Sequence, residues 1–379
     1  MSRKATEEVH HGQIMAQYRK VMGWSQQDLA DALGVSLRTV QRMEQEAVMK
    51  NLERRRFLVA LLGIPAAFLG LDQERQEINT LVFNEDPMSF LEDTMASRWK
   101  AQLMGGPVHA AQGLDRFVNE VIHFAHQVQG QAWHRRAQAQ LCTAYQLQGS
   151  VAGDMLLYVK ALKAYQKAYT VAHELQDAEL MAAVRVREGV IFMRQEEPLK
   201  AITYLNNALD LTNGWGVPHL RGDILTLLSE AYAKAQQGQE CWHAIGLAEC
   251  VLEQEEPVRE RNYRVFSIAS VTAHKGVDAL LLRDYDRALK LIEKSLKTYN
   301  PTLTPGRARL LARKAEAYYG LKMISDCTDT AEEALTLASS VGASNTIVRL
   351  RELHSTILQS RWSKELGVRR LGALLATQR

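Results

Sequence analysis

The sequence predicts an all-α protein, with a small N-terminal helical domain followed by a right-handed superhelical array of helical pairs. Three observations support this fold class. Residues 25–44 have the capping residues and apolar spacing of two short helices joined by a tight turn. From about residue 110, a pattern of small, large and small residues at helical spacing occurs in five copies. Strand patterns and hairpin signals are absent from the sequence.

The first of the two short helices is predicted to begin directly after Ser25. Ser25 is a good N-cap, and Asp28 three residues later completes a capping box. Trp24 before the cap and Leu29 within the helix can form a hydrophobic staple. Gly34 follows the last apolar residue, where a positive φ is cheap, so we expect the helix to end there.

The second short helix is predicted to begin after Ser36, with Val40 and Met43 facing inward. Such a pair of helices can place the second helix in a DNA major groove, where Arg pairs with guanine and Gln with adenine. Gln26, at the start of the first helix, is placed to contact a phosphate. The alternative is an amphipathic hairpin without a nucleic-acid role. The outward face of the second helix consists of Leu37, Arg38, Thr39, Gln41 and Arg42.

Residues 12–48 resemble the repressor-type (XRE/Cro-like) helix-turn-helix family of bacterial and phage regulators. The resemblance rests on Gln26, Ala30, Gly34 and Val40. It implies binding to double-stranded DNA. Family members often carry Gln or another polar residue at the position of Leu37, which weakens direct base readout there. The DNA contacts that the resemblance implies come from Gln26, Leu37, Arg38, Thr39 and Arg42.

Length and charge are consistent with a soluble DNA-binding protein of at least two units. The chain has 379 residues, of which 46% are apolar and 23% charged. Residues 1–58 contain ten Lys and Arg and seven Asp and Glu, whereas the rest of the chain contains 36 residues of each sign. The net charge of +3 therefore lies in the predicted DNA-binding segment. Scattered cysteines without a Cys-x-x-Cys spacing favour buried thiols in a reducing cytoplasm over zinc ligands or disulfides. They are Cys142, Cys241, Cys250 and Cys327.

We expect the DNA-binding domain to span residues 1–50, a linker with an apolar helix to span 51–107, and the repeats to span 108–379. Arg54 and Arg55 precede an apolar run over residues 57–71, which resembles a twin-arginine export signal. That run is short for a membrane span and follows a folded domain instead of starting the chain. A buried linker helix is therefore favoured over membrane contact or export, and no membrane partner is expected.

The repeats are recognised by their second helices, whose triplets recur at offsets of 40, 43, 44 and 39 residues. Small residues allow paired helices to approach closely, and the large residue between them fills the next pair. A longer amphipathic helix precedes each triplet, over residues 133–150, 178–194, 220–236, 265–282 and 307–321. The triplets are Ala161/Tyr165/Ala168, Ala201/Leu205/Ala208, Ala244/Ala248/Val251, Ala288/Ile292/Ser295 and Cys327/Ala331/Ala334.

These triplets resemble the tetratricopeptide repeat family, with units longer than usual. A repressor-type reader followed by such repeats resembles the peptide-sensing transcription regulators of Gram-positive bacteria. That resemblance implies a homodimer whose repeats bind a signalling peptide, as in quorum sensing. Dimerisation is also expected physically, because one helix-turn-helix contacts too few base pairs for strong specificity. The rival hypothesis is an interaction scaffold whose repeats bind and inhibit a partner protein.

The concave side of such an array is the expected ligand site. Asn side chains can pair with the backbone of an extended peptide, and Arg with its carboxylate. These positions are Arg185, Asn206, Asn207 and Asn262, with Arg187 nearby, and the alternative is that they are ordinary surface residues. No catalytic constellation, metal site or cofactor motif stands above background, so an enzyme is not expected.

Overall fold

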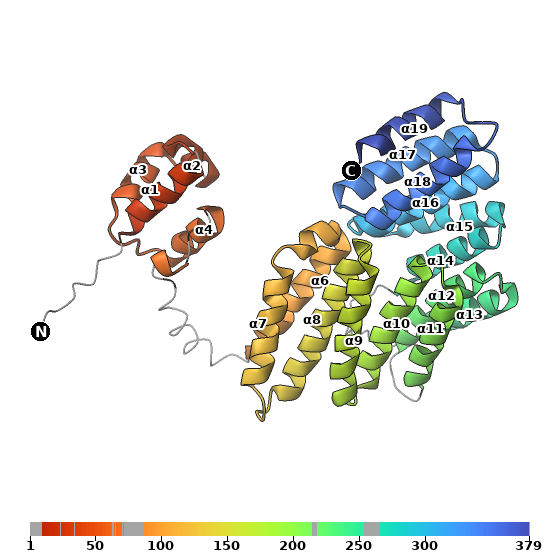
Figure 1. The fold of residues 1–379 in the computed structure, drawn as a ribbon, viewed down its shortest axis with the longest axis horizontal. Coiled ribbons are helices and arrows are strands. Elements are labelled where there is room, and N and C mark those ends of the chain that lie inside the picture. The colour runs from red at the N-terminus through yellow and green to blue at the C-terminus, as the bar shows by residue number, and fades with distance from the viewer. Residues whose placement is uncertain are drawn as a thin grey trace, which may run out of the picture. The chain divides into compact units, whose positions relative to one another are not determined.

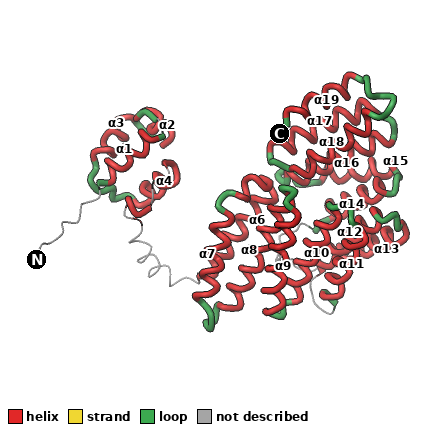
Figure 2. Tube along the Cα trace, in the orientation of Figure 1, coloured by secondary structure: helices red, strands yellow, loops and turns green. Residues whose placement is uncertain are grey.

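In the computed structural model, every regular element of the described residues is a helix and none is a strand, which confirms the all-α prediction (Figure 2). The described residues are 10–22, 24–33, 35–62, 64, 66–69, 71, 87–213, 218–253 and 266–378. The chain divides into two compact units, Met1–Ser89 and Phe90–Arg379, which are described separately (Figure 1).

The first unit is a small helical bundle. Its helices are α1 (His11–Val21), α2 (Gln26–Leu33), α3 (Leu37–Gln45) and α4 (Leu52–Leu62), with the short 3₁₀ helix η1 (Ala66–Leu69). Met15 of α1, Leu29 and Ala30 of α2, and Val40 and Met43 of α3 are fully buried together. The first three helices therefore pack by the apolar faces that the sequence predicts.

The apolar segment after residue 57 belongs to this bundle. Leu58 and Leu62 of α4, then Ile64 and Leu69, are buried in the same core as Met15. The core of the first unit therefore continues beyond residue 50, where the DNA-binding domain was expected to end, because these side chains complete the core that α1 to α3 leave open. Among the described residues, no helix is both long and apolar enough to cross a membrane.

The second unit is a run of helical pairs (Figure 1). It starts with α6 (Pro87–Ala111), which is kinked at Gly106, and α7 (Leu114–Gln127). The kink lies at the C-terminal end of the linker expected over residues 51–107. The first helices of the five pairs are α8 (His134–Asp154), α10 (Ala178–Arg194), α12 (Pro218–Lys234), α14 (Ile268–Leu281) and α16 (Thr304–Gly320). Their second helices are α9 (Tyr158–Glu174), α11 (Pro198–Leu211), α13 (Gly238–Leu252), α15 (Tyr285–Thr298) and α17 (Ile324–Ser340).

The predicted triplets hold each pair together. The large residue of three triplets lies over a glycine of the preceding first helix: Tyr165 over Gly149, Leu205 over Gly189 and Ile292 over Gly276. A Cβ added to Gly276 would be 2.8 Å from Cγ1 of Ile292. Glycine on the first helix thus provides the space that the large residue occupies, and both partners are needed for close packing.

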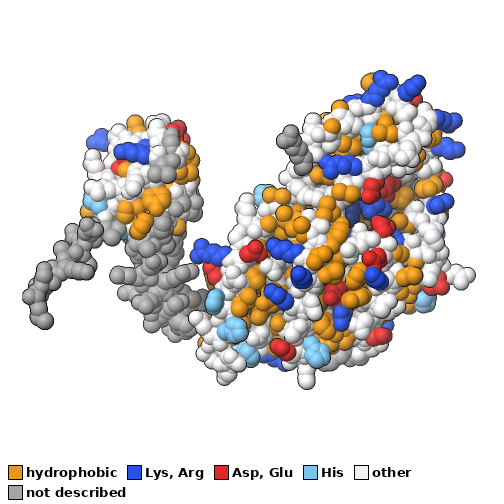
Figure 3. Space-filling model, viewed as in Figure 1, with side chains coloured by type: hydrophobic (Ala, Val, Ile, Leu, Met, Phe, Trp, Pro, Cys, Tyr) orange, Lys and Arg blue, Asp and Glu red, His pale blue; other side chains and the backbone are white. Residues whose placement is uncertain are grey.

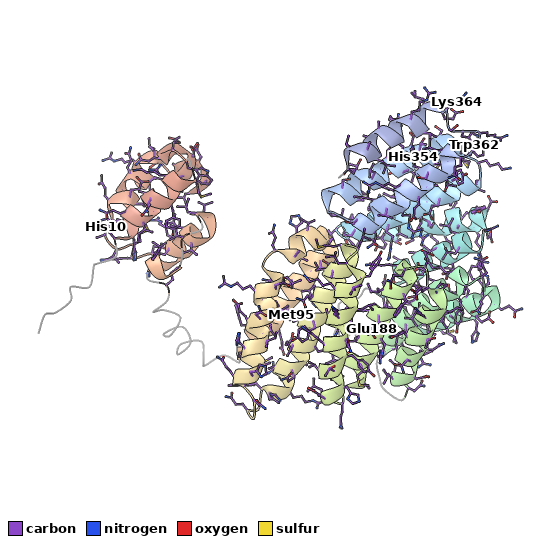
Figure 4. The ribbon with its side chains drawn as sticks, viewed as in Figure 1. His10, Met95, Glu188, His354, Trp362 and Lys364 are labelled. Carbon is purple, nitrogen blue, oxygen red and sulfur yellow. The ribbon has the colours of Figure 1, made fainter. Side chains whose placement is uncertain are left out.

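The array ends in α18 (Ser344–Leu358) and α19 (Leu366–Thr377). Between them, Trp362 packs edge-to-face on Tyr319 with a centroid separation of 6.2 Å, and Figure 4 shows the place of Trp362 beside His354 and Lys364. Lys and Arg side chains gather over this end of the unit in Figure 3, and exposed Arg361, Lys364 and Arg369 belong to it.

The last pair returns to the first. The turn between α17 and α18 contacts the kink of α6, because a Cβ added at Gly106 would lie 3.1 Å from Cβ of Val341. Asn345 at the start of α18 hydrogen-bonds with Tyr158 at 3.2 Å. The two ends of the array therefore meet, and the first helices of the pairs surround a common interior.

Candidate nucleic-acid interface and ligand cavity

The two short helices of the first unit are capped as their sequence predicts. The backbone N–H of Asp28 donates to Oγ of Ser25 at 3.1 Å, and that of Ser25 donates to the Asp28 carboxylate at 2.7 Å. These hydrogen bonds lower the pKa of Asp28. At α3, the backbone N–H of Thr39 donates to Oγ of Ser36 at 3.2 Å. The start of each helix is therefore fixed by its own cap.

A buried carboxylate joins the three helices that carry the interface. Glu44 of α3 accepts from Nε of Arg19 on α1 at 2.6 Å and from Nε2 of Gln26 on α2 at 2.6 Å. Arg19 also donates to the carbonyl oxygen of Trp24 at 2.6 Å, in the segment between α1 and α2. Because Arg19 and Glu44 are both largely buried, this network fixes the orientation of α3 against the other two helices.

The solvent-facing side of α3 carries groups suited to DNA. Leu37, Arg38, Gln41 and Arg42 are exposed, and Thr39 is half-buried with its hydroxyl 2.8 Å from that of Ser36. Neither arginine forms an ion pair with another described residue, so both guanidinium groups are available for phosphate or base contacts. The arrangement presents two cations and an amide on one helix face.

The N-terminal end of α1 is fixed against the segment that follows α3. Nδ1 of buried His11 accepts a hydrogen bond from the backbone N–H of Met49 at 3.1 Å. Burial, then the positive charge of Arg55, lowers the pKa of His11. The neutral ring is the form that can accept this hydrogen bond.

A second candidate site lies in the array, where an open cavity of about 490 Å³ is lined by α6, the first helices of the pairs and the start of α18. Its walls are polar, with three guanidinium groups and two carboxylates. The charged residues are Arg187, Arg194, Arg309, Asp154 and Asp223, and His274, Gln102, Asn300 and Asn345 add further polar groups. A volume of this size suits a small polar molecule or the end of a peptide.

One wall of the cavity is an organised hydrogen-bonded group. Arg194 donates to Asp154 at 2.7 Å, and the amide of Gln102 donates to the other oxygen of that carboxylate. Burial opposes the charge of Arg194, but Asp154 raises its pKa. Nearby, the guanidinium of Arg187 lies 4.3 Å from the ring centroid of Trp99, and its Nε donates to Gln146 at 2.9 Å. These groups are held in place before any ligand is bound.

From His274 at the cavity, a chain of largely buried polar and charged groups crosses successive first helices. Glu230 of α12 lies 3.2 Å from His274 of α14 and 3.6 Å from Arg313 of α16. Glu316 then joins Arg313 at 3.0 Å to Arg349 of α18 at 3.1 Å. Burial acts to raise the pKa of Glu230, but His274 and then Arg313 hold it below its usual value. Each acidic side chain in this chain of groups therefore lies next to a basic one on a neighbouring helix or turn.

Among the described residues, no group of three or more His, Cys, Asp or Glu side chains is placed to hold a metal ion. The four cysteines are free thiols, of which Cys142, Cys241 and Cys327 are buried and Cys250 is exposed.

Residues 15–69 match the family model described as Helix-turn-helix, and the match includes α2, α3 and α4. This part of the chain is a helix-turn-helix domain. Comparison with curated protein sequences gives no significant match.

Two solved structures are similar to part of this chain. A Rap protein complexed with competence and sporulation factor is 10% identical, with 77% of this chain and 88% of that chain covered and a TM-score of 0.50. BtubC from P. vanneervenii is 15% identical, with 60% of this chain and 92% of that chain covered and a TM-score of 0.43. At 10% identity, the Rap protein supports the fold of the helical repeats and nothing further.

The helix-turn-helix domain brings the sequence-predicted DNA residues onto one side of α3, with one difference. Gln26, expected to contact a phosphate, is half-buried, and its Nε2 donates to Glu44. Its Oε1 lies 3.5 Å from Nε2 of Gln41. Gln26 therefore orients Gln41 and Glu44 in this structure, and its DNA contact stays a prediction. The role of Arg19 and Glu44 was not recognised from the sequence.

The sequence-predicted ligand residues do not come together at the cavity. Arg185 instead stacks on Tyr169 at 3.8 Å and pairs at 2.8 Å with Glu188, which is labelled in Figure 4. Asn206 and Asn207 lie on α11, outside the cavity wall, and Asn262 lies outside the described residues. Arg187 does line it. Most of the charged cavity residues missed by the sequence analysis lie on the first helices of the pairs, where a charged residue within an otherwise apolar helix is their signal in the sequence.

Proposed function

We propose that this protein is a sequence-specific DNA-binding transcription regulator that inserts α3 into the major groove. The observation that carries the proposal is the exposed face of α3, where Arg38, Gln41 and Arg42 are presented by a helix held through the Arg19–Glu44 pair. Arg and Gln are the side chains best suited to bidentate contacts with guanine and adenine. The match of residues 15–69 to the helix-turn-helix model supports the same role.

We further propose that the repeat unit senses a peptide or protein ligand and forms a homodimer in the cytoplasm, without enzymatic activity. The fold shared with a Rap protein, which was crystallised with competence and sporulation factor, supports a sensing role. Two copies would place two α3 helices in half-sites one or more turns of DNA apart, about 34 Å for one turn. The dimer would supply the specificity that a single domain lacks.

The test is selection of bound sequences from a random duplex pool by the purified full-length protein, followed by a salt titration on the enriched duplex. We expect a palindrome with two half-sites, and a logarithm of the association constant that falls linearly with the logarithm of salt concentration. The slope should correspond to about 0.9 per phosphate neutralised. A substitution of exposed Gln27, which lies on α2 away from the proposed base-reading face of α3, serves as a control with unchanged slope.

Two outcomes would contradict the proposal. If no sequence is enriched at low salt, sequence-specific DNA binding is refuted, and a scaffold that binds a partner protein becomes the better hypothesis. If one half-site is enriched and sedimentation gives a monomer on DNA, the DNA-binding role stands and the homodimer is refuted.

A further inference from the structure

We infer that the cavity of the array binds a polar ligand through a carboxylate or phosphate group, and that Arg309 is the residue that recognises this anion. The inference rests on the proposed ligand-sensing function and gives it a site and a ligand chemistry. Two features support the inference: the location of the cavity, and the absence of an ion-pair partner for Arg309 among the described residues.

The cavity lies where the two ends of the array meet. Its walls include Gln102 of α6, Asp154 of α8 and Asn345 of α18. Asn345 also donates to the carbonyl oxygen of Gly153 at 3.3 Å, which links α18 to α8 beside the cavity. A ligand here would contact the first and last pairs together, so its binding energy would act on the closure of the array.

The guanidinium groups at the wall are not equivalent. Arg194 is neutralised by Asp154 at 2.7 Å, and Arg187 lies against Trp99 with its Nε bonded to Gln146. Arg309 of α16 is exposed at the cavity and forms no ion pair with a described residue. Arg309 is thus the wall cation that is ready to take an anionic oxygen, with the fork geometry that suits carboxylate and phosphate.

The Glu230 carboxylate interacts with Arg309 but does not satisfy it. Glu230 is positioned by His274 at 3.2 Å and Arg313 at 3.6 Å, while Arg309 contributes only a weaker electrostatic attraction. Three guanidinium groups at the cavity face two carboxylates, Asp154 and Asp223. One further negative charge in the cavity would balance them.

An independent feature of the wall also indicates a ligand. Gln102 is 5% exposed, and its amide nitrogen donates to Asp154. Its Oε1 is buried and has no hydrogen-bond partner among the described residues. An acceptor buried without a partner is costly, and a ligand N–H or O–H would satisfy it. The ligand we infer therefore carries a donor as well as an anionic group.

The experiment measures binding of three probes to the full-length protein by equilibrium dialysis: random pentapeptides with free carboxylates, the same pool amidated, and inorganic phosphate. The variants are Arg309→Gln, which removes the charge, and Arg309→Lys, which retains it. Arg307→Gln is the matched control, because Arg307 is on the same helix but outside the cavity wall, 4.0 Å from Glu333. We expect about 10- to 100-fold weaker binding for Arg309→Gln and little change for Arg307→Gln.

The probes separate the two sources of the anion. Retention of free-acid peptides over amidated ones assigns the site to a peptide terminus, and binding of phosphate assigns it to a phosphorylated or free anion. The inference is overturned if no probe binds, or if Arg309→Gln and Arg307→Gln weaken binding equally. Binding of the selected DNA duplex by the same preparations is measured separately. A loss of DNA binding alone would contradict the proposed regulator function but not the proposed anion site.

Discussion

The side-chain amide of Asn345 donates a hydrogen bond to the backbone carbonyl of Gly153, 192 residues earlier in the chain. Its carbonyl oxygen accepts from the hydroxyl of Tyr158 at 3.2 Å. Beside this pair, the kink at Gly106 packs against Val341. The helical array is therefore closed by contacts between its ends, in addition to the contacts between neighbouring pairs.

Substitution of Gly106 by Ala should open this closure. Gly106 has φ of +76°, which a side chain rarely adopts, and an added Cβ would press on the carbonyl oxygen of Val341. We expect a loss of about 2 kcal/mol or more in stability of the α6 contact, measured by hydrogen exchange of residues 341–345.

Gly105→Ala is the control for this position. An added Cβ at Gly105 meets the ring of His109 at 3.2 Å, and that exposed side chain can move. Equal effects of the two substitutions would show that closure of the array does not depend on the conformation of Gly106.

Substitution of two glycines of the paired helices by Ala should change the free energy of unfolding in opposite directions. Gly149→Ala would place Cβ 2.6 Å from Cδ1 of Tyr165, a buried ring that cannot withdraw, and should destabilise the array by about 1–3 kcal/mol. Gly246→Ala, on α13 with no atom within 4 Å of the new Cβ, should stabilise by about 0.5–1 kcal/mol through helix propensity. Urea denaturation measures both, and destabilisation by Gly246→Ala would contradict the account.

Much of this array was predictable from the sequence because its repeats are local. The helix expected over residues 178–194 is α10 (Ala178–Arg194), and that expected over 265–282 is α14 (Ile268–Leu281). Their apolar periodicity and the following small-large-small triplet lie within a few helical turns, so a short stretch of sequence contains the relevant signal.

The closure and the cavity were not predictable in this way. Asn345 contacts Gly153 because each helical pair is rotated relative to the one before it, and these rotations add up along the array. No short stretch of sequence contains the total rotation. Likewise, the Glu44 carboxylate bonds to Arg19 and Gln26 through tertiary packing of three helices. The apolar run around Leu58 has the same sequence pattern whether it completes a neighbouring bundle or forms a separate linker helix, so the extent of the first core could not be predicted from it.

Substitution of Glu44 by Gln should loosen the helix-turn-helix domain. The change leaves the guanidinium of Arg19, which is 7% exposed, without its counter-charge. Breaking one partner of a buried pair costs about 3–5 kcal/mol. Hydrogen exchange of α1 to α3 should accelerate strongly, while exchange in α8 to α17 should not change. Substitution of the partly exposed Glu92, which pairs with Arg136 at 3.0 Å in the second unit, is the control and should cost less than about 1 kcal/mol.

Substitution of Arg38 or Arg42 by Ala should weaken specific DNA binding without unfolding the domain. Both side chains are exposed, so stability should change little. Each residue that reads a base should contribute about 1–3 kcal/mol to binding of the selected duplex, measured by fluorescence anisotropy. A residue that contacts only phosphate should instead lower the salt slope by about 1. Unchanged binding in both variants would refute the assignment of α3 as the recognition helix.

The stability of the array should also depend on pH through Asp278. This residue of α14 is fully buried. Burial raises its pKa well above the usual value, because the charged carboxylate would lose its water. In the unfolded chain the same carboxyl loses its proton at a pH of about 4. As the pH rises above about 4, ionisation stabilises the unfolded chain while Asp278 in the folded chain stays protonated, so the free energy of unfolding falls until the folded pKa is passed.

Asp278→Asn removes this ionisation and should make the protein more stable than the natural chain at pH 7, with the difference shrinking as the pH approaches 4. The measurement is the thermal midpoint of both proteins across this range. Asp154→Asn is the control with the opposite sign at pH 7, because Asp154 forms an ion pair with Arg194 at 2.7 Å and its charge stabilises the fold. If Asp278→Asn lowers the midpoint at pH 7, the carboxyl of Asp278 is ionised and stabilised by its neighbours in the folded chain, and the assignment of a protonated Asp278 is wrong.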